Sequence, residues 1–371
     1  MLRSCDLHPA RLLLPPPPIP ETMTGTTAIP EVQREIGALL ATYGQPDDRA
    51  AWLQVANTLL PFAVFWLLAI ASLRLTFPLA YGLTLLYTIA ASGCLLRVFG
   101  IQHDCGHNSF FRSKIANETL GLVCSVLTIT PYHYWKRSHA YHHAHVSNLD
   151  YREMGYITIK TVAEYERMTT GARWRYRLYQ NPFIMFGLGS TIKFLVLQRL
   201  TYHIPRDWLK ERRNVRNTNL AIALLWAMMI AIVGVQSFLL VQLPIVVFTS
   251  AAGVWIFYIQ HVYEDTSLQP SERWDYATAC LESCSYYALP QVLEWCALYN
   301  NIHHIHHACS RVPNYRIAKC FAAHAELRNV RHISLRESFA SCAHLGLWDA
   351  ESQRLVRVAE VELRLRDREN K

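Results

Sequence analysis

The stretch of chain from Thr218 to Gln260 contains no charged residue. An α-helix rises about 1.5 Å per residue, and the hydrocarbon core of a bilayer is about 30 Å thick. The stretch is therefore long enough to cross a membrane twice. Gln236, Ser237 and Pro244 interrupt it in the middle, so we predict two helices, over residues 219–236 and 243–261.

A second apolar region extends from Trp52 to Gln102 and carries only two charges, on Arg74 and Arg97. A proline at position 78 divides it, which predicts helices over residues 54–74 and 79–102. Arg74 fits the turn between them, and Arg97 either reaches the membrane surface or lines a site. The expected fold class is an all-α integral membrane protein with four transmembrane helices in two hairpins.

Positive charge is concentrated in the segments that flank these predicted spans. Residues 136–216 and 311–368 are rich in Lys and Arg, and basic loops next to spans remain in the cytosol. With four crossings, both basic regions and both termini lie on the cytosolic side. The net charge of +8 then indicates attraction to membrane lipid, and we expect no nucleic-acid partner because no nucleic-acid-binding motif occurs.

Composition divides the chain into three parts. Residues 1–50 contain a run of four prolines and are expected to be extended and mobile. Residues 51–350 form the membrane domain, and residues 351–371 form a charged C-terminal tail. The ten cysteines are scattered without a CxxC motif, which favours a reducing, cytosolic compartment over a disulfide framework.

Histidines occur in three clusters, and each cluster follows a helical spacing. Residues three or four apart share one face of a helix, so each cluster directs its imidazoles to the same side. Imidazole is a good ligand for zinc, copper, iron and nickel. The clusters are His103 and His107, then His139, His142 and His143, then His303, His306 and His307.

The number of clustered histidines favours two metal ions. A single zinc takes about four protein ligands, so eight are too many for one zinc and enough for two metals with open coordination positions. No HExxH motif of the zinc proteases is present. We predict iron, because histidine-rich sites with open positions suit oxygen chemistry. Two zinc ions or copper remain open on ligand type alone.

The predicted topology brings all three clusters to one membrane face. The same argument adds His261, which lies at the cytosolic end of the last predicted span. Asp104, Glu264 and Asp265 are candidates to orient the ligand imidazoles from behind. His304 is left out, because the helical spacing turns it away from His303 and His307.

The sequence around these histidines resembles the membrane fatty acid desaturase family from residue 50 to residue 350. The likeness rests on His103-Asp-Cys-Gly-His107, on the two HxxHH clusters and on Tyr258-Ile-Gln-His261. It is closest to the acyl-lipid branch that includes omega-6, or Δ12, enzymes.

The resemblance implies two iron ions, held by the eight clustered histidines together with His261, and a cytosolic helical cap that carries the clusters. It implies an O2-dependent reaction that removes two hydrogens from adjacent methylenes of a fatty acyl lipid and leaves a cis double bond. It also implies an external electron donor of the ferredoxin or cytochrome b5 type. Trp255, Phe257 and Tyr258 are candidates to line a tunnel for the acyl chain.

Two other functions are consistent with the sequence. One is a diiron membrane hydroxylase or ketolase that acts on an alkyl, sterol or carotenoid substrate. The other is a membrane metal-binding or transport protein without catalysis. A transport pathway needs ionisable residues inside the spans, and the charge-free stretch from residue 218 to residue 260 disfavours it.

Overall fold

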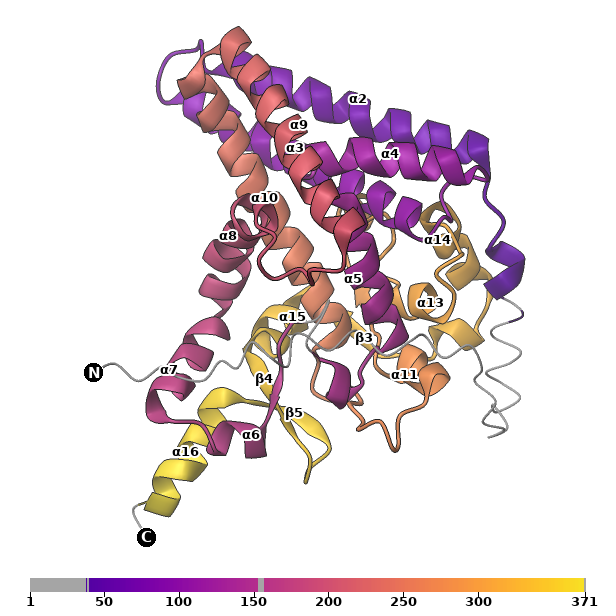
Figure 1. Cartoon of the computed structure of the whole chain (residues 1–371), viewed down its shortest axis with the longest axis vertical. Helices are drawn as coiled ribbons and strands as arrows, with labels where there is room; N and C mark the ends of the chain where they lie inside the picture. The colour runs from indigo at the N-terminus through magenta and orange to yellow at the C-terminus, as the bar shows by residue number, and fades with distance from the viewer. Residues whose placement is uncertain (1–37, 39, 153–156, 370–371) are drawn as a thin grey trace.

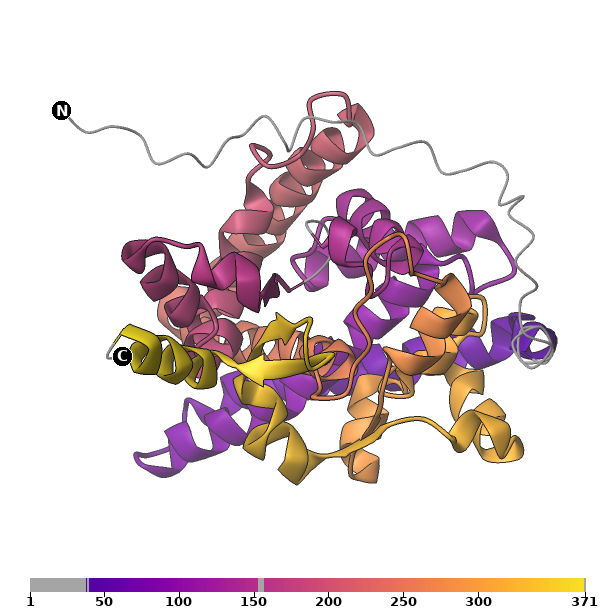
Figure 2. The same ribbon diagram turned by 90° about the horizontal axis from the view of Figure 1, so that it is seen from below.

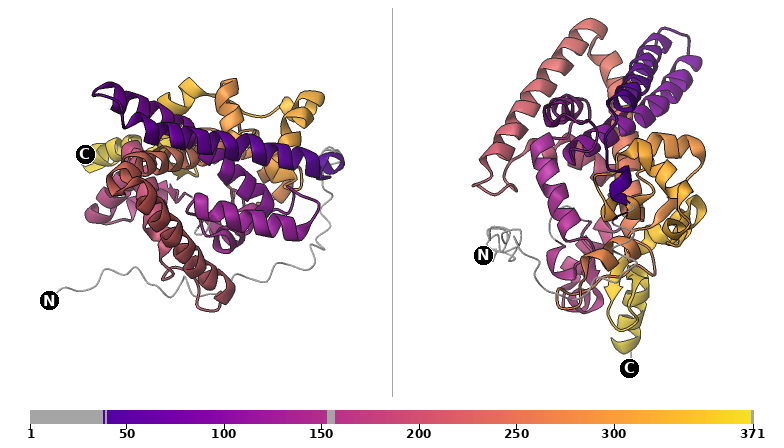
Figure 3. Two further views of the ribbon diagram at one scale, coloured as in Figure 1. Left: turned by 90° about the horizontal axis from the view of Figure 1, so that it is seen from above. Right: turned by 90° about the vertical axis from the view of Figure 1, so that its right-hand side faces the viewer.

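The computed structural model describes residues 38, 40–152 and 157–369, and these are mostly helical. Within them, four helices are long and apolar enough to cross a membrane: α2 (Asp48–Ser72), α3 (Leu79–Gly106), α9 (Leu209–Val233) and α10 (Val235–His261). This finding confirms the four predicted spans. In Figure 1 these helices occupy the upper part of the molecule, and in Figure 3 α2 with α3 diverges from α9 with α10.

The boundary between α9 and α10 differs from the predicted one. The chain turns at Gly234, where φ is +80° and ψ is 152°, a conformation that only glycine adopts at low cost. Pro244, which was expected to separate the helices, lies inside α10. A proline within a membrane helix is tolerated where the neighbouring structure compensates for the backbone hydrogen bond that it removes.

Arg97 is buried among helices and is not one of the residues that line the cavity beside the histidines. Its guanidinium is buried and donates to Thr58 Oγ1 (3.1 Å) and Asn57 Oδ1 (2.7 Å) on α2. It also donates to the Trp295 carbonyl of α12 (Gln291–Ala297) and lies 3.7 Å from the Trp295 ring centroid. Arg97 therefore fastens α3 to α2 and to α12.

The remaining elements lie mostly below the four long helices in Figure 1. The helices are α4 (Lys114–Leu127), α5 (Tyr132–Ala144), α6 (Val162–Glu166), α7 (Thr170–Tyr179), α8 (Ser190–Leu195), α11 (Tyr276–Glu282), α13 (His303–Ala308), α14 (Asn314–Ala323), α15 (Leu335–Ala340) and α16 (Val358–Glu369). A π-helix, η3 (Phe183–Gly189), precedes α8, and short 3-10 turns are η2 (Leu149–Tyr151), η4 (Leu197–Arg199), η5 (Glu326–Arg328) and η6 (Cys342–His344).

Two small sheets accompany the helices of this lower part, where a helical cap was expected. In one, β1 (Lys160–Thr161) pairs in parallel with β4 (Leu345–Asp349), which pairs antiparallel with β5 (Arg354–Arg357). In the other, β2 (Tyr286–Ala288) pairs in parallel with β3 (His332–Ser334). Figure 2 shows β4 and β5 from below. These strands are too short to leave a periodic signal in the sequence.

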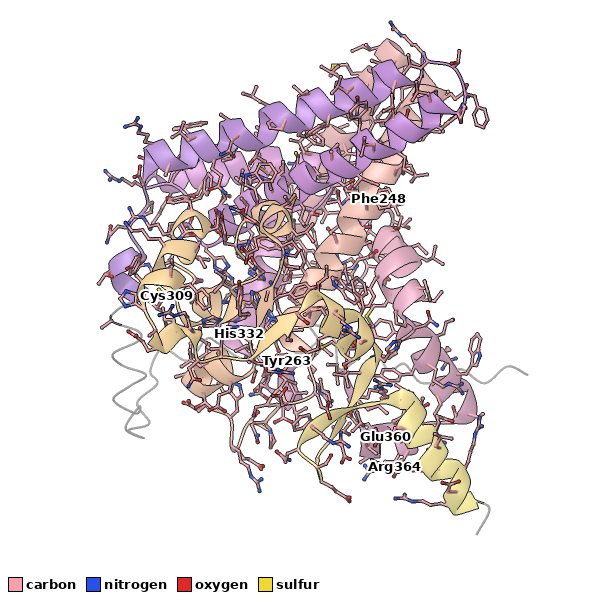
Figure 4. All side chains as sticks on the ribbon, turned by 180° about the vertical axis from the view of Figure 1, so that it is seen from behind. Phe248, Tyr263, Cys309, His332, Glu360 and Arg364 are labelled. Atoms are coloured by element: carbon pink, nitrogen blue, oxygen red, sulfur yellow. The ribbon has the colours of Figure 1, made fainter. Side chains whose placement is uncertain are left out.

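The segment 351–371 was expected to be a charged tail. In the structure β5 belongs to the three-stranded sheet, and Leu355, Val356 and Val361 are fully buried. The charges lie on the outer side of α16, where Glu360 and Arg364 pair at 2.5 Å (Figure 4). The described part of this segment therefore packs onto the fold. Most of the proline-rich segment 1–50 lies outside the described residues.

Candidate metal centre

Four helix segments bring the nine predicted histidines together. His103 lies in the last turn of α3 and His107 directly follows that helix, while His261 is the last residue of α10. The HxxHH clusters form parts of two short helices, α5 and α13. In Figure 1 these two helices lie beside the lower parts of the long helices. The helical spacing assumed from the sequence is therefore the spacing in the fold.

The nine histidines divide into two groups, and the potential ligand atoms within each group lie within 4.8 Å of one another. The division does not follow the sequence clusters. Two histidines four positions apart in one cluster belong to the same group. In each HxxHH cluster the middle histidine, three positions after the first, belongs to the other group. The first group is His103, His107, His139, His143 and His306, and the second is His142, His261, His303 and His307.

The ring nitrogens in each group are spaced as metal ligands. In the first group Nε2 of His139 lies 3.0 Å from that of His103 and 3.1 Å from that of His143. In the second, Nε2 of His303 lies 2.9 Å from that of His261 and 3.0 Å from that of His307. A metal–imidazole bond of about 2.1 Å places two ligand nitrogens at right angles about 3.0 Å apart.

Hydrogen bonds alone do not account for this arrangement. A neutral imidazole has one N–H, yet Nε2 of His139 and Nε2 of His303 each face two other ring nitrogens. Nε2 of His107 is buried and has no hydrogen-bond partner among the described residues. A cation at the centre of each group would satisfy these converging lone pairs, so the residues present fit two metal ions.

Burial keeps the imidazoles on α5 and α13 in the form that binds metal. Desolvation, and secondly the neighbouring imidazoles, lowers the pKa of each of these rings well below its usual value of 6.5. They are therefore neutral at pH 7 with a lone pair available on one nitrogen. The rings concerned are His139, His142, His143, His303, His306 and His307.

Asp104 contacts a histidine of the first group, as the sequence suggested. Its Oδ1 accepts from Nδ1 of His103 at 3.0 Å, which leaves Nε2 of that ring directed at the group. Its Oδ2 accepts from both the backbone N–H and the side-chain amide of Asn314, each at 2.7 Å. Gln54 on α2 donates to Asn314 Oδ1 at 2.6 Å. A chain of hydrogen bonds thus joins α2, α14 and α3 behind His103.

Glu264 and Asp265 do not contact a histidine of the centre, contrary to the role suggested for them. Both side chains are exposed, and they pair with Arg354 (2.7 Å) and Arg331 (3.3 Å). Nδ1 of His261 faces the Ser283 carbonyl oxygen at 3.4 Å instead. The reason is local: α10 ends at His261 and Val262 is extended, so the chain leaves the helix before it reaches the two acids.

Sequence reasoning missed Asn314 as a partner of this centre. A lone asparagine after a proline carries no signal of its own, and its contact with Asp104 spans 210 residues of sequence. His304 belongs to neither group of histidines, and its Nε2 lies 2.9 Å from the Leu327 carbonyl oxygen.

A cavity of about 280 Å³ adjoins the histidines. His103, His139 and His303 line it, and half of the other lining residues belong to α3 and α10, including the apolar side chains of Leu95, Phe99 and Phe257. It extends along α10 from Val246 to Gln260, which is about 21 Å of helix. A long, narrow, apolar molecule could therefore lie beside α10 with part of its length next to the histidines.

One of the three candidate tunnel residues lines this cavity, namely Phe257. Trp255 instead donates to the Tyr287 hydroxyl at 3.0 Å and stacks on Phe339. Tyr258 is buried and donates to the Leu345 carbonyl. The other two rings therefore hold α10 against α15 and the lower sheets.

Comparisons with known proteins agree with this geometry. The model of the fatty acid desaturase family matches residues 76–338. A fatty acid desaturase of Bacillus subtilis (strain 168) is 42% identical over 324 residues, which are 87% of this chain and 90% of that protein. An sn-1 oleoyl-lipid 12-desaturase of Anabaena variabilis is 24% identical, over 75% of this chain and 77% of that protein. A chloroplastic omega-6 fatty acid desaturase of Brassica napus is 21% identical, over 82% of this chain and 63% of that protein.

Proposed function

The chain belongs to the fatty acid desaturase family, and we propose on this basis that it introduces a cis double bond into the acyl chains of membrane lipids, using O2. The observation that carries the proposal is the apolar cavity whose wall includes His103, His139 and His303. An acyl chain in this cavity would present its methylenes to the two histidine groups.

We propose that each histidine group holds one iron ion, the first with five imidazoles and the second with four. Bound iron would supply the redox chemistry that activates O2 and oxidises an unactivated C–H bond, which zinc, being redox-inert, does not supply. The protein's own contribution is to hold the imidazoles in place and fix their direction. Asp104 and Ser283 fix the direction of His103 and His261, respectively, through Nδ1.

The walls of the cavity have two further tasks. Side chains such as Leu95, Phe99 and Phe257 would keep water away from the reacting methylenes, and a site closed to water suppresses side reactions. They also fix the chain along its length, and a displacement of about 1 Å at the reacting carbons can lower the rate by about 100-fold. The acyl chain is thus positioned by shape, since it offers few polar groups to recognise.

We further propose that the histidine groups and both termini lie on the cytosolic side, and that electrons come from a separate ferredoxin or cytochrome b5-type protein. Basic segments flank the spans, including Arg173, Arg175 and Arg177 on α7. Such a surface would steer an acidic donor. The donor-coupled rate should then fall as ionic strength rises, and a rate independent of salt would contradict this part of the proposal.

Lipid analysis in a host without polyunsaturated lipids tests the proposed reaction. The wild-type chain should produce a new unsaturated acyl species, detected by gas chromatography–mass spectrometry. His142→Ala removes a member of the second group and should abolish the product. His324→Ala is the matched control, because its ring contacts Tyr43 and Glu326 away from the centre, and it should leave the product in place.

The same measurement separates the alternatives. A hydroxylated or keto lipid without a new double bond would replace desaturation with the hydroxylase or ketolase reaction. Protein that contains zinc alone, with no O2 consumption and no altered lipid, would instead indicate a metal-binding protein without catalysis.

A further inference from the structure

The cavity beside the histidines contains one lysine in an otherwise uncharged wall. Among the residues that line the cavity, Lys193 of α8 is the only Lys, Arg, Asp or Glu. It is also the one exposed residue in that lining, so the cavity opens to the outside where Lys193 lies. None of the described carboxylates lies within ion-pair distance of its ammonium group.

Other polar side chains also line the cavity near Lys193. Gln198 of η4 lines the cavity, and its Oε1 is buried without a hydrogen-bond partner among the described residues. Tyr134 lines the cavity from α5, and the centroid of its ring lies 5.2 Å from that of His203. Burial, and secondly the charge of Lys193, lowers the pKa of His203. The Lys193 ammonium and the Tyr134 hydroxyl are thus donors at this opening, and the unpartnered Gln198 oxygen is an acceptor suited to the ammonium group.

The opening lies in a segment with the character of a membrane surface. Phe183 of η3 is 88% exposed and Tyr202 is 75% exposed, and exposed apolar residues recur between them. Arg199 of η4 donates to Asn219 Oδ1 of α9 at 2.9 Å, three residues after the last charge on α9, Arg216. This is the level at which α9 passes from charged to uncharged sequence, and it corresponds to the headgroup boundary of a bilayer.

We propose that Lys193, assisted by Gln198 and Tyr134, binds the phosphate of a membrane phospholipid whose acyl chain occupies the cavity. The inference rests on the proposed function, because it assumes that the cavity holds an acyl chain. An ammonium group is a compact partner for a phosphate oxygen. An amide N–H and a phenolic O–H would donate to the remaining oxygens.

The phospholipid is preferred over other anionic acyl compounds by the place of the opening. A lipid in the bilayer keeps its phosphate at the headgroup boundary, and its chain could enter the cavity sideways past the exposed apolar surface of η3 and α8. A fatty acid carboxylate, or the phosphate of a soluble acyl thioester, offers the same charge. Those compounds therefore serve as competitors in the test.

Lipid retention by the purified full-length protein tests the proposal without turnover. Native mass spectrometry would compare phosphatidylglycerol with diacylglycerol of identical saturated chains, and with palmitate and palmitoyl-CoA. Wild type should retain phosphatidylglycerol about tenfold more strongly than diacylglycerol, since a charged hydrogen bond contributes about that much. Lys193→Met should remove this preference, and Lys193→Arg should keep it.

Lys210→Met is the matched control. Lys210 is an exposed lysine near the start of α9 that pairs with Glu118 at 3.7 Å and does not line the cavity, so the preference should persist. Equal retention of phosphatidylglycerol by wild type and Lys193→Met would overturn the proposal, as would stronger Lys193-dependent retention of palmitate or palmitoyl-CoA. Because no turnover is required, phospholipid retention without desaturation would contradict only the proposed function.

Discussion

Asp104 connects the candidate metal centre to the packing of three helices. One carboxylate oxygen accepts from His103 and the other accepts twice from Asn314. A carboxylate behind a ligand imidazole fixes its tautomer and makes its other nitrogen a stronger donor to metal. The direction of His103 therefore depends on contacts between distant parts of the chain, and not on its own helix alone.

Asp104→Asn should weaken this support while preserving the side-chain volume. We expect metal affinity or lipid desaturation to fall by about 10- to 100-fold. Iron content after dialysis against a chelator, together with product formation, measures the effect. Glu264→Gln is the matched control, because that acid pairs with Arg354 at the surface. If both variants behave like wild type, Asp104 does not support a metal ligand.

Acid should destabilise the metal-free protein through the six buried imidazoles of α5 and α13. Their pKa values are lowered in the folded state, so below about pH 6.5 the unfolded chain binds protons that the folded chain does not. The free energy of unfolding should therefore fall as pH drops below 6.5. Thermal unfolding in detergent at pH 7.5 and 5.5 measures this, and an unchanged or higher midpoint at pH 5.5 would contradict it.

At the residue scale, spacing rules were sufficient to find the histidines but not their surroundings. Ligands on one helix face share a fixed i, i+3, i+4 relation, so their grouping is visible in the sequence. The division into two groups, the contact of Asn314 and the departure of Glu264 from the helix depend on where the chain turns. Glu264 lies outside α10 because Val262 is extended and ends the helix. No residue preference marks Val262 as the end of a helix.

At the scale of elements, α10 supplies both a metal-binding histidine at its end and one wall of the cavity along its length. Gly253 lies midway along this wall. A Cβ added there would meet Leu96 Cδ1 at 3.6 Å, an ordinary contact. The position thus accepts a side chain without a clash at Cβ, while a larger group would extend into the cavity.

Gly253→Phe should fill the cavity and leave the histidines untouched. We expect desaturation to fall by at least about 100-fold, because the acyl chain loses its place beside the centre, with iron content unchanged. Gly82→Phe on α3 is the matched control, since no atom lies within 4 Å of a Cβ added there. Product yield and iron content are measured together, and full activity in Gly253→Phe would exclude this cavity as the acyl site.

The number of spans was predictable because an uncharged stretch of sufficient length has few alternatives. Their ends were less predictable. Gly234 and Pro244 both disrupt helices on average, and the structure uses the glycine as the turn while it keeps the proline within α10. Which of two helix-breaking residues forms the turn depends on the packing of both helices, and a local pattern does not contain that information.

At the scale of the whole molecule, the four spans carry a lower part in which short helices and two small sheets surround the histidines. The sheets join residues far apart in the chain, such as Lys160 with Leu347. Strands of two to five residues have no detectable alternation, so their pairing and the packing of the segment after residue 351 were out of reach of the sequence.

Iron bound per chain tests the central claim, that two histidine groups form a two-metal centre. Protein loaded anaerobically with iron and freed of loosely bound metal should contain two irons per chain by mass spectrometry of the metal. His306→Ala, in the first group, and His261→Ala, in the second, should each lower that number. A value of one iron in the wild type, or two zinc ions that iron cannot replace, would contradict the account.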